Sequence, residues 1–224
     1  SEEVMSIRIL LLTTALCASC SGNPENIIVQ LPACIQDSGI TLVEAIAQRR
    51  SVRIFTEASI TLPELARILH SAEGITSERG FRAAPSAGAA YPLSLFVIAE
   101  NIEDLEPGIY RFNPLENHLV AIQSGNFLQD LALAALRQPC ITNAPAVFVI
   151  TADYSITTSI YGDRGIMYVH MEAGHVSQNI YLQCTALELG TVAVGAFTDS
   201  AVAEILNLEP NEIPLYIMPV GRIR

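Results

Sequence analysis

The sequence predicts a single α+β domain in which helices and a β-sheet pack in layers. Half of the 224 residues are hydrophobic and only 16% are charged, so the chain has enough apolar material for one core. Segments with apolar residues at helical spacing alternate with short apolar runs typical of strands. A mixture of both element types is typical of layered α+β folds. We assign residues 41–224 to this domain.

Residues 1–22 have the pattern of an export signal. Arg8 supplies one positive charge, and the apolar run 9–16 is too short to span a bilayer but suits a signal-peptide core. Small residues before Cys20 resemble a bacterial lipoprotein processing site. We therefore expect an exported protein, periplasmic or lipid-anchored. The alternative is a buried N-terminal helix or strand in an uncleaved, cytoplasmic protein. Polar residues 23–40 would be a linker.

Two capping boxes mark the first helices of the domain. Each places a threonine three residues before a glutamate, at 41–44 and at 61–64. The first helix should extend to about Arg49. The second, with Pro63 in its first turn, should end at Gly74.

Apolar runs predict the strands and the remaining helices. Residues 146–150 are β-branched or aromatic apart from one alanine, so they predict a buried strand. Residues 108–112 and 118–122 flank a turn and predict a hairpin. The longest helical stretch, 166–189, is apolar nearly all round, which predicts a place in a core or at an interface. Further strands are expected at 95–99, 191–194 and 215–220, and further helices at 127–136 and 201–206.

The charged residues exclude several classes of function. The net charge of −11 argues against nucleic acid and anionic membrane surfaces as partners. All twelve basic residues are arginines, which excludes lysine Schiff-base chemistry and a Walker-type phosphate loop. No C-x-x-C pair occurs in the body of the chain, so a zinc site is not expected.

A cluster of basic residues follows the first predicted helix. Arg49, Arg50 and Ser51 could hold a phosphate group, and Arg53 shares the face of Ser51 if the chain is extended. The alternative is a helix C-terminus stabilised by positive charge.

Three other segments could bind a flat ligand. Pro85, Ser86, Ala87 and Gly88 form a loop of small residues that would let a ligand approach the backbone, unless it is an ordinary turn. On the long helix, Gly174 favours close packing, Gln178 is polar on an apolar surface, and His175 is more simply a structural residue. Gly195 and Ala196 follow a predicted strand, and Arg222 lies in either a phosphate site or a solvated tail.

The order of these motifs resembles the nitroreductase superfamily, and in detail its SagB-type, azoline dehydrogenase-like branch. Arg-Arg-Ser-x-Arg, Pro-Ser-Ala-Gly, Glu-Ala-Gly-His-x-x-Gln-Asn and Gly-Ala-Phe occur in that order between residues 40 and 222. The resemblance implies a three-layer α/β/α fold with a central, mostly antiparallel sheet, as an FMN-binding homodimer.

The resemblance also implies roles for these residues. Arg49, Arg50 and Ser51 would contact the FMN phosphate and ribityl chain, and Arg53 would lie near flavin N1 and O2. Pro85, Ser86, Ala87 and Gly88 would lie beside the flavin ring of the partner subunit. Gly195 and Ala196 would face flavin N5, and Gln178 and Arg222 would be further cofactor contacts.

One departure from the branch concerns catalysis. Azole-forming members carry Lys-Tyr before a glycine, whereas this chain has Ile160, Tyr161 and Gly162. Tyr161 is then the candidate catalytic residue. Tyrosine alone is a poor base near neutral pH unless it is activated.

The expected activity is hydride transfer through FMN, with NAD(P)H as a plausible donor and a small molecule or a peptide as substrate. The alternatives are an azoline-to-azole dehydrogenase, a flavin-destroying enzyme and a flavin-binding exported protein without turnover.

Overall fold

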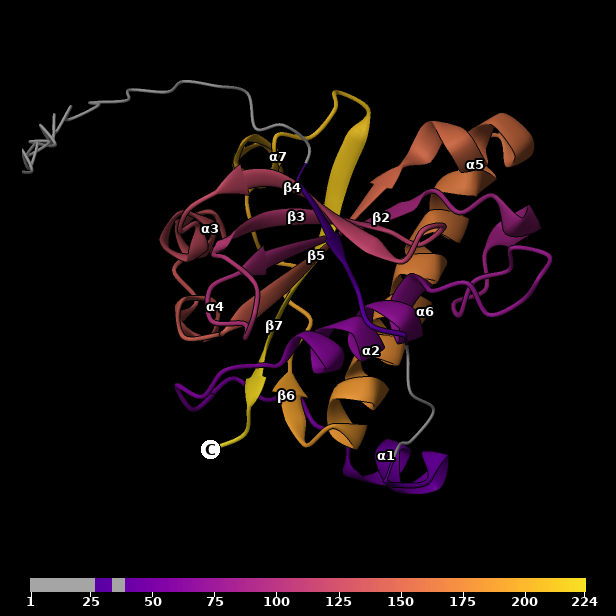
Figure 1. The fold of residues 1–224 in the computed structure, drawn as a ribbon. Helices are drawn as coiled ribbons and strands as arrows, with labels where there is room; N and C mark the ends of the chain where they lie inside the picture. Colours follow the sequence, from indigo (N-terminus) through magenta and orange to yellow (C-terminus); the bar gives the residue numbers. More distant parts are fainter. Residues whose placement is uncertain (1–26, 34–38) are drawn as a thin grey trace, which may run out of the picture.

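A computed structural model describes residues 27–33 and 39–224, and Figure 1 shows its fold. The predicted signal segment lies outside these residues, so export stays a prediction. The described chain forms a seven-stranded sheet in the order β1-β4-β3-β2-β5-β7-β6, and every pair of neighbouring strands is antiparallel. The strands are β1 (Ile28–Gln30), β2 (Leu93–Ala99), β3 (Gly108–Asn113), β4 (His118–Ser124), β5 (Ala146–Asp153), β6 (Leu189–Thr191) and β7 (Glu212–Arg222).

Helices cover both faces of the sheet (Figure 1). They are α1 (Leu42–Gln48), α2 (Leu62–Glu73), α3 (Leu128–Ala134), α4 (Pro139–Thr142), α5 (Tyr154–Tyr161), α6 (Arg164–Ala186) and α7 (Asp199–Leu206). Helices α2 and α6 pack on one face, and α3, α4 and α7 pack on the other. The predicted three-layer α/β/α fold is therefore confirmed.

Strand β5 lies in the interior of the sheet, between β2 and β7, and its side chains are apolar in both directions. Phe148 and Ile150 point toward α2 and α6, whereas Val147 and Val149 point toward α3 and α7. All four side chains are fully buried, so each face of the strand supplies part of a separate hydrophobic cluster. Burial of such side chains contributes about 1.5–3 kcal/mol each, which fixes the strand between its layers.

The capping boxes form as predicted and hold the starts of α1 and α2. The Thr41 N–H donates to Glu44 at 2.8 Å, and the Thr61 N–H donates to Glu64 at 2.9 Å. In each case the glutamate N–H donates back to the threonine hydroxyl.

Several elements differ from the prediction. The predicted strand 191–194 is wrong: β6 comes earlier and ends at Thr191, because the Ala193 N–H donates to the side chain of Tyr181 instead of to a neighbouring strand. The last strand is longer than expected, and α4 and α5 were missed. Residues 28–30, inside the predicted linker, form β1 and pair with β4.

Helix α5 forms from a segment rich in Ser, Thr and Ile, which gives little helical signal by itself. Asp153 caps its N-terminus by accepting from the Ser155 N–H at 2.8 Å. Gly165 of α6 packs so closely on α5 that a Cβ there would lie 2.9 Å from the backbone of Thr157 and Thr158. The helix is thus held by tertiary packing.

Candidate functional site

The basic segment after α1 runs beside β6 as an extended chain. The Val52 N–H donates to the Thr191 carbonyl at 2.9 Å, and Phe55 pairs with Ile223 beyond the end of β7. Gly190 makes this approach possible, since a Cβ there would lie 2.7 Å from the Val52 side chain. The packing therefore fixes the position of Arg49 to Arg53 relative to the sheet.

Tyr181 of α6 joins this segment to the chain that follows β6. Its hydroxyl accepts the Ala193 N–H at 2.8 Å and lies 3.0 Å from the Ser51 hydroxyl, to which it can donate its own hydrogen. The Arg49 guanidinium lies over the Tyr181 ring, 5.0 Å from its centroid. Sequence reasoning missed Tyr181. The available signal was a polar group one helical turn after Gln178 on an otherwise apolar helix.

Gly195 and Ala196 follow the segment that Tyr181 contacts, and we call Tyr181, residues 49–53 and residues 193–196 the group around Tyr181. Gly195 and Ala196 are exposed, directly after Val194, which pairs with Ile217 of β7 through two backbone hydrogen bonds of 2.8 and 3.0 Å. Gln138 at the start of α4 donates to the Ala196 carbonyl at 3.4 Å. Through Tyr181 and the pairing with β6, the structure thus connects the segment of Arg49 and Ser51 with the chain that leads into residues 195–196.

Three arginines in this group have no carboxylate partner in the described part of the chain. Arg49 stacks on Tyr181, and Arg50 donates to the carbonyls of Ala47 and Arg49 at 3.0 and 2.7 Å. Arg53 is exposed and lies near Cys140; burial raises the pKa of that thiol, and the arginine offsets part of the rise. Positive charge that no carboxylate neutralises is what a phosphate site needs, so these residues fit the phosphate of FMN.

Arg222 differs from these arginines because its guanidinium is already occupied. It donates to both carboxylate oxygens of Glu64, at 3.0 and 3.1 Å, and to the Ser59 carbonyl at 3.1 Å. A phosphate at Arg222 would have to compete with Glu64.

The loop 85–91 forms a second group with Tyr161. Gly88 has a φ of +62°, and a Cβ there would lie 2.7 Å from the Tyr161 hydroxyl, so glycine favours this close approach. Within the loop, the Tyr91 N–H donates to the Ser86 hydroxyl at 2.9 Å. Tyr161 ends α5, and its ring makes an edge-to-face contact with Tyr168, with centroids 5.2 Å apart.

This second group borders a cavity on α6. The cavity has a volume of about 240 Å³ and is lined by Pro85, Ser86, Ala87, Tyr168, Met171, Glu172 and His175. Gln178 is exposed farther along the helix. Among the described residues, no hydrogen bond joins this group to the one around Tyr181, so a single chain presents the predicted site residues as two separate sets.

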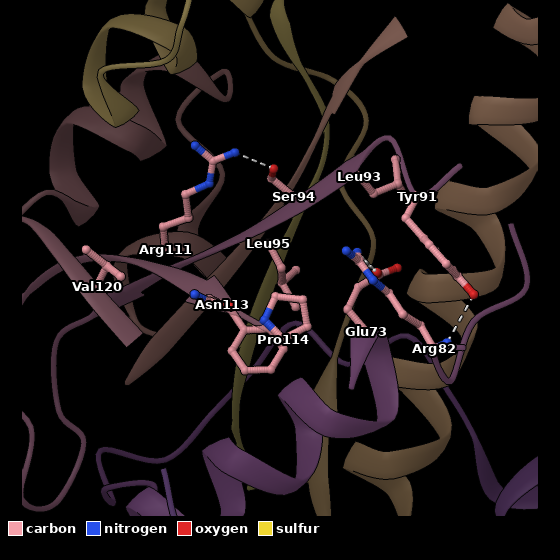
Figure 2. A pocket seen from close by; sticks show the side chains of 11 residues that line it. Glu73, Arg82, Tyr91, Leu93, Ser94, Leu95, Arg111, Asn113, Pro114 and Val120 are labelled. Carbon is pink, nitrogen blue, oxygen red and sulfur yellow. Dashed lines mark hydrogen bonds and ion pairs between the residues drawn. The ribbon is translucent and has the colours of Figure 1, made fainter. Parts of the chain in front are cut away.

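Sequence reasoning also missed a buried charged cluster behind the loop. The Arg82 Nη1 donates to Glu73 Oε2 at 2.6 Å, and its guanidinium lies 4.6 Å from the centroid of the Tyr91 ring. Figure 2 shows these three side chains together at a pocket of about 320 Å³. Burial raises the pKa of Glu73, and Arg82 offsets part of this rise. Glu73 lies at the end of α2 and Arg82 in the loop that follows, nine residues later, and no local motif in the sequence indicates that the chain turns back to pair them.

Glu172 brings a second carboxyl group to this cluster, since both Glu73 and Arg82 act on it electrostatically. Burial raises its pKa to about 7; Ser86 and Arg82 act in the opposite direction, and Glu73 adds to the rise.

The described residues contain no group of three or more His, Cys, Asp or Glu able to hold a metal ion. Within the same residues, no helix has the length and apolarity needed to cross a membrane.

Comparisons with known proteins support the resemblance of the sequence motifs. The nitroreductase family matches residues 46–222. The protein MJ1384 of Methanocaldococcus jannaschii, named as a nitroreductase, is 49% identical over 183 residues, which cover 82% of this chain and 91% of that protein. A solved nitroreductase structure from Anabaena variabilis matches with a TM-score of 0.80 and 27% identity, over 93% of this chain and 45% of that one.

Two further relatives have lower sequence identity to this chain. The microcin B17-processing protein McbC of Escherichia coli is 28% identical over 146 residues, which cover 62% of this chain and 53% of McbC. The trifolitoxin operon protein TfxC of Rhizobium leguminosarum is 26% identical over 196 residues, which cover 80% of this chain and 55% of TfxC. The chain spans about half the length of these two relatives. The family match covers most of the domain, and the fold and the order of the motifs agree with it. This chain therefore belongs to the nitroreductase family of oxidoreductases.

Proposed function

We propose that this oxidoreductase binds FMN and catalyses hydride transfer as a homodimer. The observation that carries the proposal is the group around Tyr181. Within the described part of the chain, Arg49, Arg50 and Arg53 have no carboxylate partner. Tyr181 joins their segment to Ala193, just before the exposed Gly-Ala segment, and these are positions that the family resemblance assigns to the cofactor. When bound, FMN would accept a hydride from a donor and release it to an acceptor.

The chain's own residues would hold and orient the cofactor. Arg49, Arg50 and Ser51 would bind the phosphate and ribityl oxygens through charge-assisted hydrogen bonds. Arg53 would place a fixed positive charge beside the edge of the ring, where negative charge develops on reduction. The exposed backbone at Gly195 and Ala196 would lie along the ring. Because Arg222 is paired with Glu64, we assign it a secondary role.

The homodimer is supported by the exposed side of α6. Ile166, Met167 and Met171 are large apolar residues that are between 45% and 50% exposed. Gly174 on the same helix faces open space, so the close packing predicted for it does not occur within the described chain. An apolar helix face of this kind is typical of a subunit interface. In a dimer, the loop 85–88 beside α6 would contribute to the partner's flavin site.

A dihydronicotinamide is the donor we favour, with a quinone or nitroaromatic compound as acceptor. Oxidation of a peptide azoline is the second candidate, and it is favoured by the relationship to McbC and TfxC. In that case Tyr161 beside Gly88 would have to remove the proton, without the lysine whose place Ile160 takes. A flavin-binding protein without turnover is the third candidate, and it would show no steady-state oxidation of NAD(P)H.

The test begins with the absorbance spectrum of the purified protein and the amount of FMN released per subunit. We expect a flavin spectrum and about one FMN per subunit. Arg49→Gln and Arg53→Gln should weaken FMN binding by about tenfold or more each, because each removes a charged contact worth about 1.5–3 kcal/mol. Arg79→Gln, which changes an exposed arginine outside the site, is the matched control. A colourless protein that takes up no FMN, or full FMN retention in both variants, would refute the assignment.

A further inference from the structure

The buried carboxyl group of Glu172 has an unusual environment beside the loop 85–88. The residue is 2% exposed, and neither carboxyl oxygen has a hydrogen-bond partner among the described residues. Buried polar groups are normally hydrogen-bonded, and those without a partner call for an explanation. Structural carboxyl groups in a core are usually satisfied, so a functional explanation is favoured here.

Burial and the neighbouring charged groups together set the pKa of Glu172. Arg82 lowers the pKa of Glu172, but the Arg82 Nη1 already donates to Glu73 at 2.6 Å, and Glu73 is a second acidic group that raises this pKa. Tyr168 and His175 of α6 line the same cavity as Glu172. Burial is the largest cause that raises the pKa of Glu172, to about 7, so it exchanges protons in the range in which enzymes work.

Ser86 is the route by which this proton can leave. The Ser86 hydroxyl interacts with the Glu172 carboxyl without completing a hydrogen bond of normal geometry. Its oxygen accepts the Tyr91 N–H at 2.9 Å, which leaves its own hydrogen free to point toward Glu172 or into the cavity. The Glu172 oxygens are enclosed, so a ligand does not touch them directly, whereas a proton can pass through one intervening hydroxyl.

We propose that Glu172 is a positioning residue that stores a proton and delivers it through Ser86 to the acceptor. The inference rests on the proposed function. A dihydronicotinamide supplies the hydride, and the acceptor gains that hydride together with the Ser86 hydroxyl proton. The Glu172 carboxyl then reprotonates Ser86 and becomes a carboxylate, which takes a proton from water. The net change is acceptor, dihydronicotinamide and one proton to reduced acceptor and oxidised nicotinamide.

The first test measures the protonation of Glu172 without turnover. Carboxyl infrared spectra of the protein, recorded across pH, should show a titration near pH 7 that disappears in Glu172→Gln. The titration should persist, with a shift, in Glu172→Asp, and it should be unchanged in Glu204→Gln, which alters an exposed carboxyl on α7. A spectrum without any titration near neutral pH overturns the proposal.

The second test separates the two half-reactions by stopped-flow measurements on FMN-loaded protein. With a quinone acceptor, Glu172→Gln and Ser86→Ala should each slow the acceptor half-reaction by about 10- to 100-fold, the lower range for general acid catalysis. In Glu172→Gln, whose carboxyl is enclosed and does not contact a ligand, the donor half-reaction with NADH should change less than about twofold. Ser86→Thr and Glu172→Asp should recover part of the acceptor rate and its pH dependence, which a purely structural role would not predict.

The outcomes distinguish the inference from the proposed function. If Glu172→Gln binds FMN and runs both half-reactions as fast as the wild-type protein, the proton role is wrong and the proposed function stands. If the wild-type protein takes up no FMN or oxidises no donor, the proposed function fails, and the proton role fails with it even if Glu172 titrates. Should Glu172→Gln not fold, Ser86→Ala and Ser86→Thr decide the question by the same acceptor rates.

Discussion

Replacement of Tyr181 by phenylalanine tests whether its hydroxyl holds the proposed cofactor site together. The substitution removes one oxygen atom and leaves the ring, so the contact with the Arg49 guanidinium is retained. It removes two interactions, the 3.0 Å contact with Ser51 and the 2.8 Å hydrogen bond from the Ala193 N–H. The segments 49–53 and 193–196 would then lose the side chain that connects them.

The size of the effect on stability depends on how many hydrogen bonds Tyr181→Phe removes and on which donors it leaves unpaired. Each hydrogen bond contributes about 0.5–1.5 kcal/mol, and the half-buried Ala193 N–H would be left without a partner unless water reaches it. We therefore expect a loss of about 1–3 kcal/mol in the free energy of unfolding. If the hydroxyl also preorders the basic segment, FMN affinity should fall by about tenfold, which corresponds to about 1.4 kcal/mol.

Urea unfolding of the apoprotein and FMN titration by fluorescence quenching measure the two effects separately. Tyr216→Phe is the matched control, because among the described residues the Tyr216 hydroxyl makes no hydrogen bond that the substitution could remove. The reasoning is refuted if Tyr181→Phe matches the control in both stability and FMN affinity. A loss of stability with unchanged FMN affinity would show that the hydroxyl supports the fold alone.

Three further predictions follow from other parts of the structure. The pKa of Glu172 is about 7 in the folded protein and about 4.5 in the unfolded chain. The contribution of Glu172 to the free energy of unfolding should therefore be complete below about pH 4.5 and decline by at most about 3 kcal/mol as the pH rises to 7. Urea unfolding across this pH range should show a smaller decline in Glu172→Gln, and an equal decline would contradict the raised pKa. Gly88→Ala should destabilise the protein by about 1–3 kcal/mol, because φ is +62° and the new Cβ would meet the Tyr161 hydroxyl; adding Tyr161→Phe should recover part of the loss, and strict additivity in this double-mutant cycle would contradict the contact. Phe148→Ala should cost about 3–5 kcal/mol, measured by thermal unfolding, and a loss below about 1 kcal/mol would mean that β5 is not the centre of the core.

Local signals in the sequence were sufficient for most of the architecture. The capping boxes define where α1 and α2 begin, and the apolar run 146–150 identifies the central strand, because these features depend on neighbouring residues alone. Helix α5 was missed because its Ser- and Thr-rich sequence is held by packing on Gly165, which lies outside the segment.

The candidate site shows the same division. The basic segment and the Gly-Ala segment could be predicted because they are continuous motifs. Tyr181 was missed because its local signal, a polar group on an apolar helix, is weak, and its role comes from contacts with Ser51 and Ala193 in other segments. The pairing of Arg222 with Glu64 joins opposite ends of the domain and has no local signal either.

The strand order has a consequence for how the protein is made. Strand β7 lies between β5 and β6, so the last strand of the sheet to be synthesised fills an interior position. Until residues 212–222 are available, β5 exposes one edge and β6 has no strand beside it in the sheet. Pairing between segments so far apart along the chain slows folding and leaves strand edges open to other chains. The nascent protein therefore has to be kept from aggregating until its final strand is inserted, and chaperone dependence during synthesis is the expected cost of this topology.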